Sequence, residues 1–325
     1  MTLSPGFLVV SKEADITSHD VVAMVRAVTG IRKVGHTGTL DPFARGVLPL
    51  ALGSATRLIQ YLDESQKVYD ATIALGSATD TGDPTGEVIE ERPVPELDLH
   101  GVSAVLDGFV GDRMQKPHRY SAVKVRGKRL YEYARRGEEV EVEARPIEIF
   151  ALRALALDEG SLRVELCCSR GTYARGLADE IATALGTVGH LSALTRLRSG
   201  PFDLSRAIGL PALSELVAGT PEWTRALRRQ RGEDRVPWFP REQVHAALGS
   251  WMHSPSASLS HLPALRVSAG VGEALARGGQ VPPPPVGVRA GGRYLVTHGD
   301  ELFALALSLG GGEAKVLWRA PQPAR

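Results

Sequence analysis

One carboxylate in this sequence, Asp41, stands where a single side chain can be aimed at a substrate. It lies in the stretch from Lys33 to Leu48, whose three glycines, two threonines, histidine and proline are typical of an ordered loop. Pro42 restricts Asp41 to extended backbone conformations. The apolar run from Val47 to Leu52 follows directly, so we expect the loop to be anchored to the core.

Two distant side chains would complement such an acid. Tyr69 opens a predicted strand, and Arg175 lies at the start of a predicted helix. A carboxylate can act as a nucleophile while it is ionised, and a nearby guanidinium favours that charge, whereas a tyrosine ring can stack on a base. By residue type alone, the commoner roles are structural: a turn residue for Asp41, a core aromatic for Tyr69 and a surface position for Arg175.

Other chemistries fail on spacing. The stretch from Gly35 to Asp41 lacks the Gly-Lys-Ser/Thr ending of a phosphate-binding P-loop, and there is no His-Glu-x-x-His or Cys-x-x-Cys pattern. The two cysteines, Cys167 and Cys168, are adjacent, which suits neither a disulfide framework nor a zinc pair. We therefore expect no metal and no cofactor. Gly35 to Gly38 also matches the bare Gly-x-x-Gly loop of KH modules, a match of only four residues.

A basic stretch stands out within a chain whose formal net charge is only +1. Between Arg113 and Arg136 there are nine lysines and arginines against one acid, Glu132, and three tyrosines are interleaved with them. Basic and aromatic side chains together suit a phosphate backbone with stackable bases. A solvated basic helix is the alternative, and for a charge run taken alone it is the commoner one.

The hydrophobic periodicity predicts a mixture of strands and helices. Strands are expected at 7–10, 69–75, 87–90, 121–125, 147–157 and 162–168, and helices at 17–30, 56–62, 97–110, 128–136 and 173–185. Since strict βαβ alternation is absent, the pattern favours an α+β fold on a largely antiparallel mixed sheet over a doubly wound parallel sheet.

The length of the chain and the change in its composition toward the C-terminus indicate two domains. We expect a catalytic domain at 1–240, with a basic insertion at about 113–145, then a linker at 241–261 and a small β domain at 262–325. No apolar run reaches the roughly 18 residues of a membrane helix, and the N-terminus has no signal-type segment, so we expect a cytoplasmic protein.

Several blocks of residues follow one another in an order that one family shares. They are Gly35–Pro42, Gly53–Arg57, Lys67–Tyr69, Gly76–Thr81, Tyr120–Lys124, Gly127–Arg135, Cys168–Arg175 and His190–Arg198. In these blocks the sequence resembles the TruB family of tRNA pseudouridine synthases, over roughly residues 7–210. The blocks Gly272–Leu275, Gly278–Val281 and Gly299–Ala306 resemble a PUA domain, a small RNA-binding β barrel.

The resemblance implies that the uridine at position 55 in the T-loop of tRNA is flipped out and isomerised to pseudouridine. Asp41 matches the family's nucleophile, Tyr69 the aromatic residue that packs on the target base, and Arg175 the ion-pair partner of the aspartate. Three further matches imply substrate binding: His36 in base eversion, Leu194 in an apolar wall and Arg57 at a basic position near the pocket. Thr39, Tyr173, Lys124, Lys128 and Arg129 complete the expected substrate-binding residues.

The resemblance leaves alternatives open. A guide-RNA-dependent enzyme of the dyskerin type shares the same core, and a tRNA-binding or tRNA-folding module with dispensable catalysis is a third hypothesis. For the leading one we expect the T-arm stem-loop as substrate and no obligate protein partner. The sequence departs from the family at His118 and Arg119, where a second proline and an apolar residue are usual.

Overall fold

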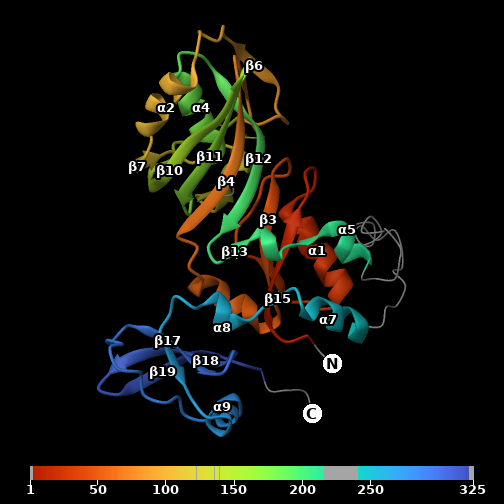
Figure 1. Ribbon diagram of the computed structural model, residues 1–325, viewed down its shortest axis with the longest axis vertical. Helices are drawn as coiled ribbons and strands as arrows, with labels where there is room; N and C mark the ends of the chain where they lie inside the picture. The colour runs from red at the N-terminus through yellow and green to blue at the C-terminus, as the bar shows by residue number, and fades with distance from the viewer. Residues whose placement is uncertain (1–2, 122, 135, 139, 216–240, 322–325) are drawn as a thin grey trace.

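The computed structural model describes residues 3–121, 123–134, 136–138, 140–215 and 241–321. Two sheets lie one above the other along the long axis of the molecule, and the C-terminal one is blue in Figure 1. No helix in these ranges is both long and apolar enough to cross a bilayer.

The large sheet forms the body of the protein and has eleven strands in the described residues. Its path is β14 (Ile208–Gly209), β1 (Gly6–Lys12), β3 (Arg45–Leu52), β12 (Gly189–Ser199), β4 (Gln66–Leu75), β11 (Ser161–Ser169), β10 (Arg145–Asp158) and β7 (Gly111–Gln115); β2 (Val34–His36), β13 (Phe202–Asp203) and β15 (Met252–His253) pair at its margins. Only β1 with β14 and β3 with β12 run parallel. The predicted α+β fold on a largely antiparallel mixed sheet is confirmed.

Strand β4 shows why the sequence pattern was informative. Its ten residues alternate strictly between partly buried and buried side chains, and the buried set includes Lys67 and Tyr69. Successive side chains of a strand point to opposite faces, so these two project from the same face at one end of β4. That end becomes a wall of the functional site.

Helices cover the sheet and fix the loops between its strands. Helix α1 (Ser18–Thr29) begins with the predicted capping box of Thr17 and Asp20 and ends at Gly30, whose φ is 68°. Helices α2 (Leu99–Asp107) and α4 (Ala174–Ala184) pack against β10 and β12 in the upper part of Figure 1. The remaining short elements of this body are η1 (Gly53–Tyr61), β5 (Ser77–Thr79), β6 (Val88–Glu91), η2 (Leu204–Arg206) and α5 (Leu210–Glu215).

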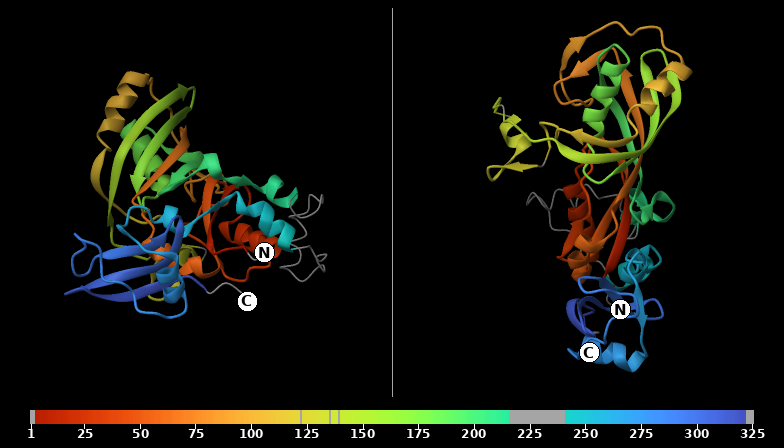
Figure 2. Two further views of the ribbon diagram at one scale, coloured as in Figure 1. Left: turned by 60° about the horizontal axis from the view of Figure 1, so that its bottom comes forward. Right: turned by 90° about the vertical axis from the view of Figure 1, so that its left-hand side faces the viewer.

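The basic segment, residues 113–145, differs from the prediction. Instead of a strand at 121–125 and a helix at 128–136, a short hairpin of β8 (Lys124–Val125) and β9 (Lys128–Arg129) precedes α3 (Leu130–Ala134). Arg126 and Gly127 have φ values of 48° and 85°, which suit a two-residue hairpin turn. The hairpin takes Lys128 and Arg129 from the expected helix, which therefore begins at Leu130. Figure 2 (right) shows the segment projecting sideways from the sheet.

The expected linker at 241–261 is folded onto the large sheet. Helix α7 (Arg241–Gly249) packs on α1, and Nε2 of His245 lies 2.9 Å from the Thr29 carbonyl oxygen. After α7, β15 pairs with β1, and the short helix α8 (Pro255–Ser258) follows. This region folds onto the sheet because Val244 and Leu248 are buried in the main core, although their neighbours in the sequence are small and polar.

The C-terminal part is an open four-stranded sheet rather than the predicted barrel. Its order is β16 (Ala264–Arg266), β17 (Arg293–His298), β18 (Glu301–Gly310) and β19 (Glu313–Arg319), and α9 (Ala269–Ala276) packs against β17 and β18. Through residue 321 the two edge strands do not pair with each other. The run Pro282–Pro285 lies between α9 and β17 and lacks backbone N–H donors, so it cannot supply a closing strand.

An apolar cluster joins the two sheets. Leu295, Leu302 and Trp318 of the C-terminal sheet pack in one buried cluster with Phe7 of β1 and Val47 of β3. The indole N–H of Trp318 also donates to the carbonyl oxygen of Ser54, at 3.0 Å. The C-terminal sheet therefore shares a buried apolar cluster with β1, β3 and η1 of the large domain.

Candidate active site

A cavity of about 920 Å³ opens where the Asp41 loop meets the start of β4 and the start of α4. Seven of the residues singled out from the sequence line it: His36, Thr39, Asp41, Tyr69, Tyr173, Arg175 and Leu194. The structure thus brings together side chains that are up to 158 positions apart in the chain. In the described ranges, no three His, Cys, Asp or Glu side chains are arranged to hold a metal ion.

The Asp41 loop is held by hydrogen bonds on its own backbone. The Ser18 hydroxyl donates to the Leu40 carbonyl oxygen at 3.0 Å and accepts from the Leu40 N–H at 2.8 Å. Just beyond Asp41, the Lys12 ammonium donates to the carbonyl oxygens of Pro42, at 3.0 Å, and Ala44, at 2.6 Å. Both sides of Asp41 are fixed, so its carboxylate has a defined direction.

Arg196 is a second clamp on this loop, and the sequence reasoning missed it. This guanidinium is 1% exposed and donates to the carbonyl oxygens of Gly38 at 3.0 Å, Thr39 at 3.3 Å and Val47 at 2.7 Å. A buried arginine that satisfies several carbonyls ties the loop to β12. One signal for it was available: Arg196 is two residues from Leu194 in a strand, so both face the same side.

Asp41 and Arg175 form a bidentate ion pair. Nε of Arg175 lies 3.1 Å from Oδ2 of Asp41, and one terminal nitrogen lies 3.4 Å from Oδ1. The side chain of Asp41 is 34% exposed and that of Arg175 only 7%, so the acid faces the cavity while its partner is buried behind it. This arrangement orients the carboxylate in a fixed plane.

Asp83 shares the same guanidinium, although the sequence analysis did not select it. Its Oδ2 lies 3.1 Å from the other terminal nitrogen of Arg175. Its Oδ1 accepts from the hydroxyls of Thr81, at 2.8 Å, and Thr85, at 2.5 Å. The alternation of Thr81, Asp83 and Thr85 could have indicated this role for Asp83. Short polar side chains two residues apart often hydrogen-bond to one another within a turn.

The electrostatics of Asp41 are balanced between opposing effects. Burial is the largest and raises the pKa of Asp41, and the Asp83 charge acts in the same direction. Arg175 and, less strongly, Lys12 lower it. The resulting pKa lies above the ordinary aspartate value, so Asp41 takes up a proton at a higher pH than an exposed aspartate does.

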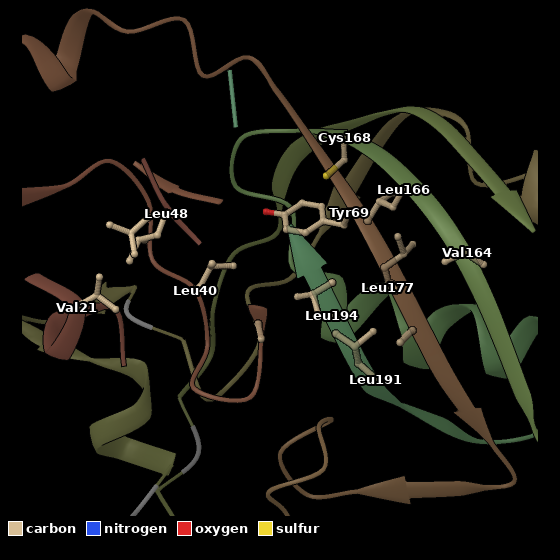
Figure 3. Close-up of a cluster of buried hydrophobic side chains, with 14 of the residues drawn as sticks. Val21, Leu40, Leu48, Tyr69, Val164, Leu166, Cys168, Leu177, Leu191 and Leu194 are labelled. Carbon is tan, nitrogen blue, oxygen red and sulfur yellow. The ribbon is translucent and has the colours of Figure 1, made fainter. Parts of the chain in front are cut away.

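Tyr69 forms an apolar wall beside the acid. Figure 3 shows its ring close to Leu194 and Cys168, with the hydroxyl oxygen pointing to the side where Leu40 lies. Burial raises the pKa of Tyr69, and the positive charge of nearby Arg196 only partly offsets this. The phenol therefore keeps its proton, so that Tyr69 can stack on a base and donate a hydrogen bond.

His36 presents an unused polar atom at the cavity. Its Nδ1 is buried and has no hydrogen-bond partner in the described part of the chain. Burial, with the nearby Arg196, lowers the pKa of His36, so the ring is neutral at pH 7. A buried polar atom without a partner is costly, and a bound polar group would satisfy it.

Two of the predicted substrate-binding residues with described side chains, Arg57 and Lys128, are not in the cavity lining. Arg57 is exposed on η1, and Lys128 is exposed on β9 with its ammonium 5.9 Å from the Tyr133 ring centroid. Lys124 and Arg129 belong to the same hairpin, but their side chains lie outside what the structure describes. The backbone of the three hairpin residues belongs to the basic segment, which projects sideways from the sheet.

Comparison with known proteins identifies the family. Residues 26–174 match the family model described as TruB family pseudouridylate synthase (N terminal domain). A protein of Geobacter sulfurreducens named tRNA pseudouridine synthase B is 42% identical over 315 residues, which is 94% of each chain. The chain belongs to the TruB family. A Francisella tularensis subsp. novicida protein of the same name is 47% identical over 212 residues, or 65% of this TruB-family chain and 70% of that protein.

Solved structures agree with this TruB assignment. A crystal structure of a Cbf5-Nop10-Gar1 complex contains a chain that matches with a TM-score of 0.66 at 25% identity, covering 97% of this chain and 85% of that one. A chain in an archaeal box H/ACA Nop10-Cbf5 complex matches with the same TM-score at 23% identity, covering 100% and 90% respectively, which shows a shared fold.

Membership of the TruB family makes this protein a pseudouridine synthase, an isomerase that acts on RNA. The reaction breaks the C1′–N1 glycosidic bond of a uridine, turns the uracil and rejoins it through C5. Substrate and product contain the same atoms, so the reaction balances without ATP or a redox carrier. An oriented carboxylate is one kind of nucleophile suited to this chemistry.

Proposed function

We propose that this enzyme isomerises the uridine at position 55 in the T-loop of tRNA, with Asp41 as the nucleophile. The observation that carries the proposal is the carboxylate of Asp41, which faces the cavity, is held by both prongs of Arg175 and has the Tyr69 ring nearby. The printed names of the Geobacter and Francisella relatives support tRNA as the substrate.

In this mechanism the target uridine leaves its stack and enters the cavity. Unstacking costs a few kcal/mol, which stacking on an aromatic side chain offsets. Tyr69 and Leu194 provide the apolar faces for the uracil, and the free Nδ1 of His36 can meet a polar group of the everted nucleotide. The uracil must be able to turn after the glycosidic bond breaks. Close stacking on one of its faces is therefore preferable to close contact on both faces.

Three routes begin at Asp41. The carboxylate attacks C1′ of the ribose, attacks C6 of the uracil, or removes a sugar proton on the way to a glycal. In each, the glycosidic bond breaks, C5 bonds to C1′, the proton on C5 is lost to a base and N1 gains a proton; on the glycal route the sugar proton is also returned. All three need the ionised carboxylate, and Arg175 favours that form.

The purified protein should turn over a T-arm stem-loop many times without any guide RNA. Release of tritium from C5-labelled uridine measures each turnover, and a stem-loop with cytidine at the target position is the matched control. A protein that is inert until a guide RNA is supplied would instead fit the dyskerin-type alternative, whose fold this chain shares. We also propose that the enzyme needs no partner protein and works in the cytoplasm.

Lys128→Ala should weaken binding of several unrelated RNAs alike, because an exposed lysine on a projecting hairpin contacts phosphates rather than base edges. The slope of log affinity against log salt should fall by about 1. Binding isotherms at four salt concentrations measure both quantities. Arg153→Ala, which removes an exposed charge from β10, is the control, and equal behaviour of the two variants would favour a purely solvated basic segment.

The C-terminal part enters this proposal as a second RNA-binding surface. We propose that the sheet within 262–321 contacts the tRNA away from the target nucleotide, as its resemblance to PUA domains implies. The catalytic domain would then extend from the N-terminus through α8, since α7, β15 and α8 pack on the large sheet.

A further inference from the structure

The guanidinium of Arg175 has five N–H donors, and the structure gives each of them an acceptor. Two donors reach Asp41, at 3.1 and 3.4 Å. Two reach the loop at 80–86, through Asp83 Oδ2 and the Thr81 carbonyl oxygen, both at 3.1 Å. The fifth donates to the carbonyl oxygen of Tyr120, also at 3.1 Å. This last acceptor is the only one of the five that comes from the basic segment.

Tyr120 is itself held by a neighbour in the basic segment, His118. The backbone N–H of Tyr120 donates to Nδ1 of His118 at 3.3 Å, and the two rings stack with centroids 6.1 Å apart and planes inclined by 30°. At the far end of the ring, the Tyr120 hydroxyl donates to Oδ2 of Asp80 at 3.3 Å. The position of the Tyr120 carbonyl therefore depends on the imidazole.

His118 also touches the loop that supplies the other partners of Arg175. A Cβ atom placed on Gly82 would lie 3.1 Å from Nε2 of His118 and 3.6 Å from Cβ of Arg175. Gly82 has a φ of 68° as well, so a side chain there would be both crowded and strained. The imidazole thus lies between the basic segment and the loop at 80–86, next to Arg175.

The charge state of His118 suits this position. Arg175 and Arg119 face the ring and disfavour a second cation, whereas Asp83 and Asp80 favour one. Burial is the largest effect and lowers the pKa of His118 to about 4. At neutral pH the ring is therefore neutral, and because its Nδ1 accepts from Tyr120, its proton lies on Nε2.

We propose that His118 is a positioning residue, whose imidazole couples the seating of the basic segment to the orientation of the Asp41–Arg175 pair. The role in turnover rests on the proposed function of Asp41. RNA that contacts the basic segment then acts on the carboxylate through Tyr120 and Arg175.

Two substitutions separate the acceptor from the ring. His118→Asn places a neutral acceptor, Oδ1, where Nδ1 stands, and His118→Phe keeps a stacking ring without an acceptor. We expect kcat on a T-arm stem-loop to fall about tenfold in the Phe variant with KM changed less than about threefold, as for loss of one positioning hydrogen bond. The Asn variant should stay within about threefold of the parent.

Limited trypsin digestion of the RNA-free protein gives a readout that does not depend on the reaction. Cleavage at the lysines and arginines of the hairpin should be several-fold faster in His118→Phe and unchanged in His118→Asn. Parental kcat and parental digestion in the Phe variant would overturn the coupling, as would equal damage in the Asn variant. If the Phe variant does not accumulate, His118→Ala replaces it. A digestion difference that persists while Asp41 proves dispensable would contradict the proposed function alone.

Discussion

Asp41→Asn is expected to reduce turnover of a T-arm stem-loop by about 10,000-fold or more, because an amide has no charge with which to attack C1′ or C6. The substitution is nearly isosteric, and the loop is held through its backbone by Ser18, Lys12 and Arg196 rather than through the Asp41 side chain. The fold and RNA affinity should therefore be retained. Single-turnover tritium release, with a filter-binding measurement alongside it, checks both expectations.

The control for this variant is Asp158→Asn, an exposed aspartate at the end of β10. It makes the same change of charge and should leave turnover within about twofold, as expected for a surface substitution. Turnover by Asp41→Asn at more than a few per cent of the parental rate would contradict the nucleophile assignment and would point to another group in the cavity.

Arg175→Lys should lower kcat on the order of 100-fold while the protein stays folded. A lysine keeps the positive charge but cannot hold both oxygens of Asp41 together with Asp83 and the two backbone carbonyls. Misorientation of a reacting group by about 1 Å has effects of this size. Steady-state kinetics with a melting curve for each variant measures the effect.

The pH profile should change in a defined direction in the same variant. The carboxylate works only when ionised, so kcat falls as pH drops through the pKa of Asp41 in the enzyme–RNA complex. Arg175 lowers that pKa, and a weaker partner leaves it higher. The acid limb should therefore move to higher pH in Arg175→Lys. Arg113→Lys is the control, since Arg113 of β7 pairs with the partly exposed Glu180 of α4, the helix that also carries Arg175, and should shift nothing.

The local sequence was sufficient where one face of an element is buried. The alternation from Tyr69 to Leu75 predicted β4, and the Thr17 and Asp20 pair predicted the start of α1, because each depends on neighbours in the chain. The hairpin at 124–129, the folded 241–261 region and the open C-terminal sheet were not predicted. In these three regions the structure depends on the backbone conformation of turns and on apolar contacts with residues that are distant in the sequence.

The site was predictable only in part for the same reason. Asp41, Tyr69 and Arg175 stand in distinctive local order and in the resembling blocks, and the structure brings them to one cavity. Arg196 and Asp83 act through carbonyl oxygens and a shared guanidinium, which exist only once the chain has folded. Arg57, although it stands in a matching block, is exposed on η1 and does not line the cavity.

The apolar cluster between the two sheets has a consequence for how the C-terminal part can be studied. Removing the chain after Ser260 would take Leu295, Leu302 and Trp318 out of the cluster that holds Phe7 and Val47, and would leave a hydrophobic surface on the large sheet. The two sheets should melt in one cooperative calorimetric transition. A truncated enzyme would then show less active protein rather than weaker tRNA affinity, so substitutions of exposed residues on the C-terminal sheet are the informative route.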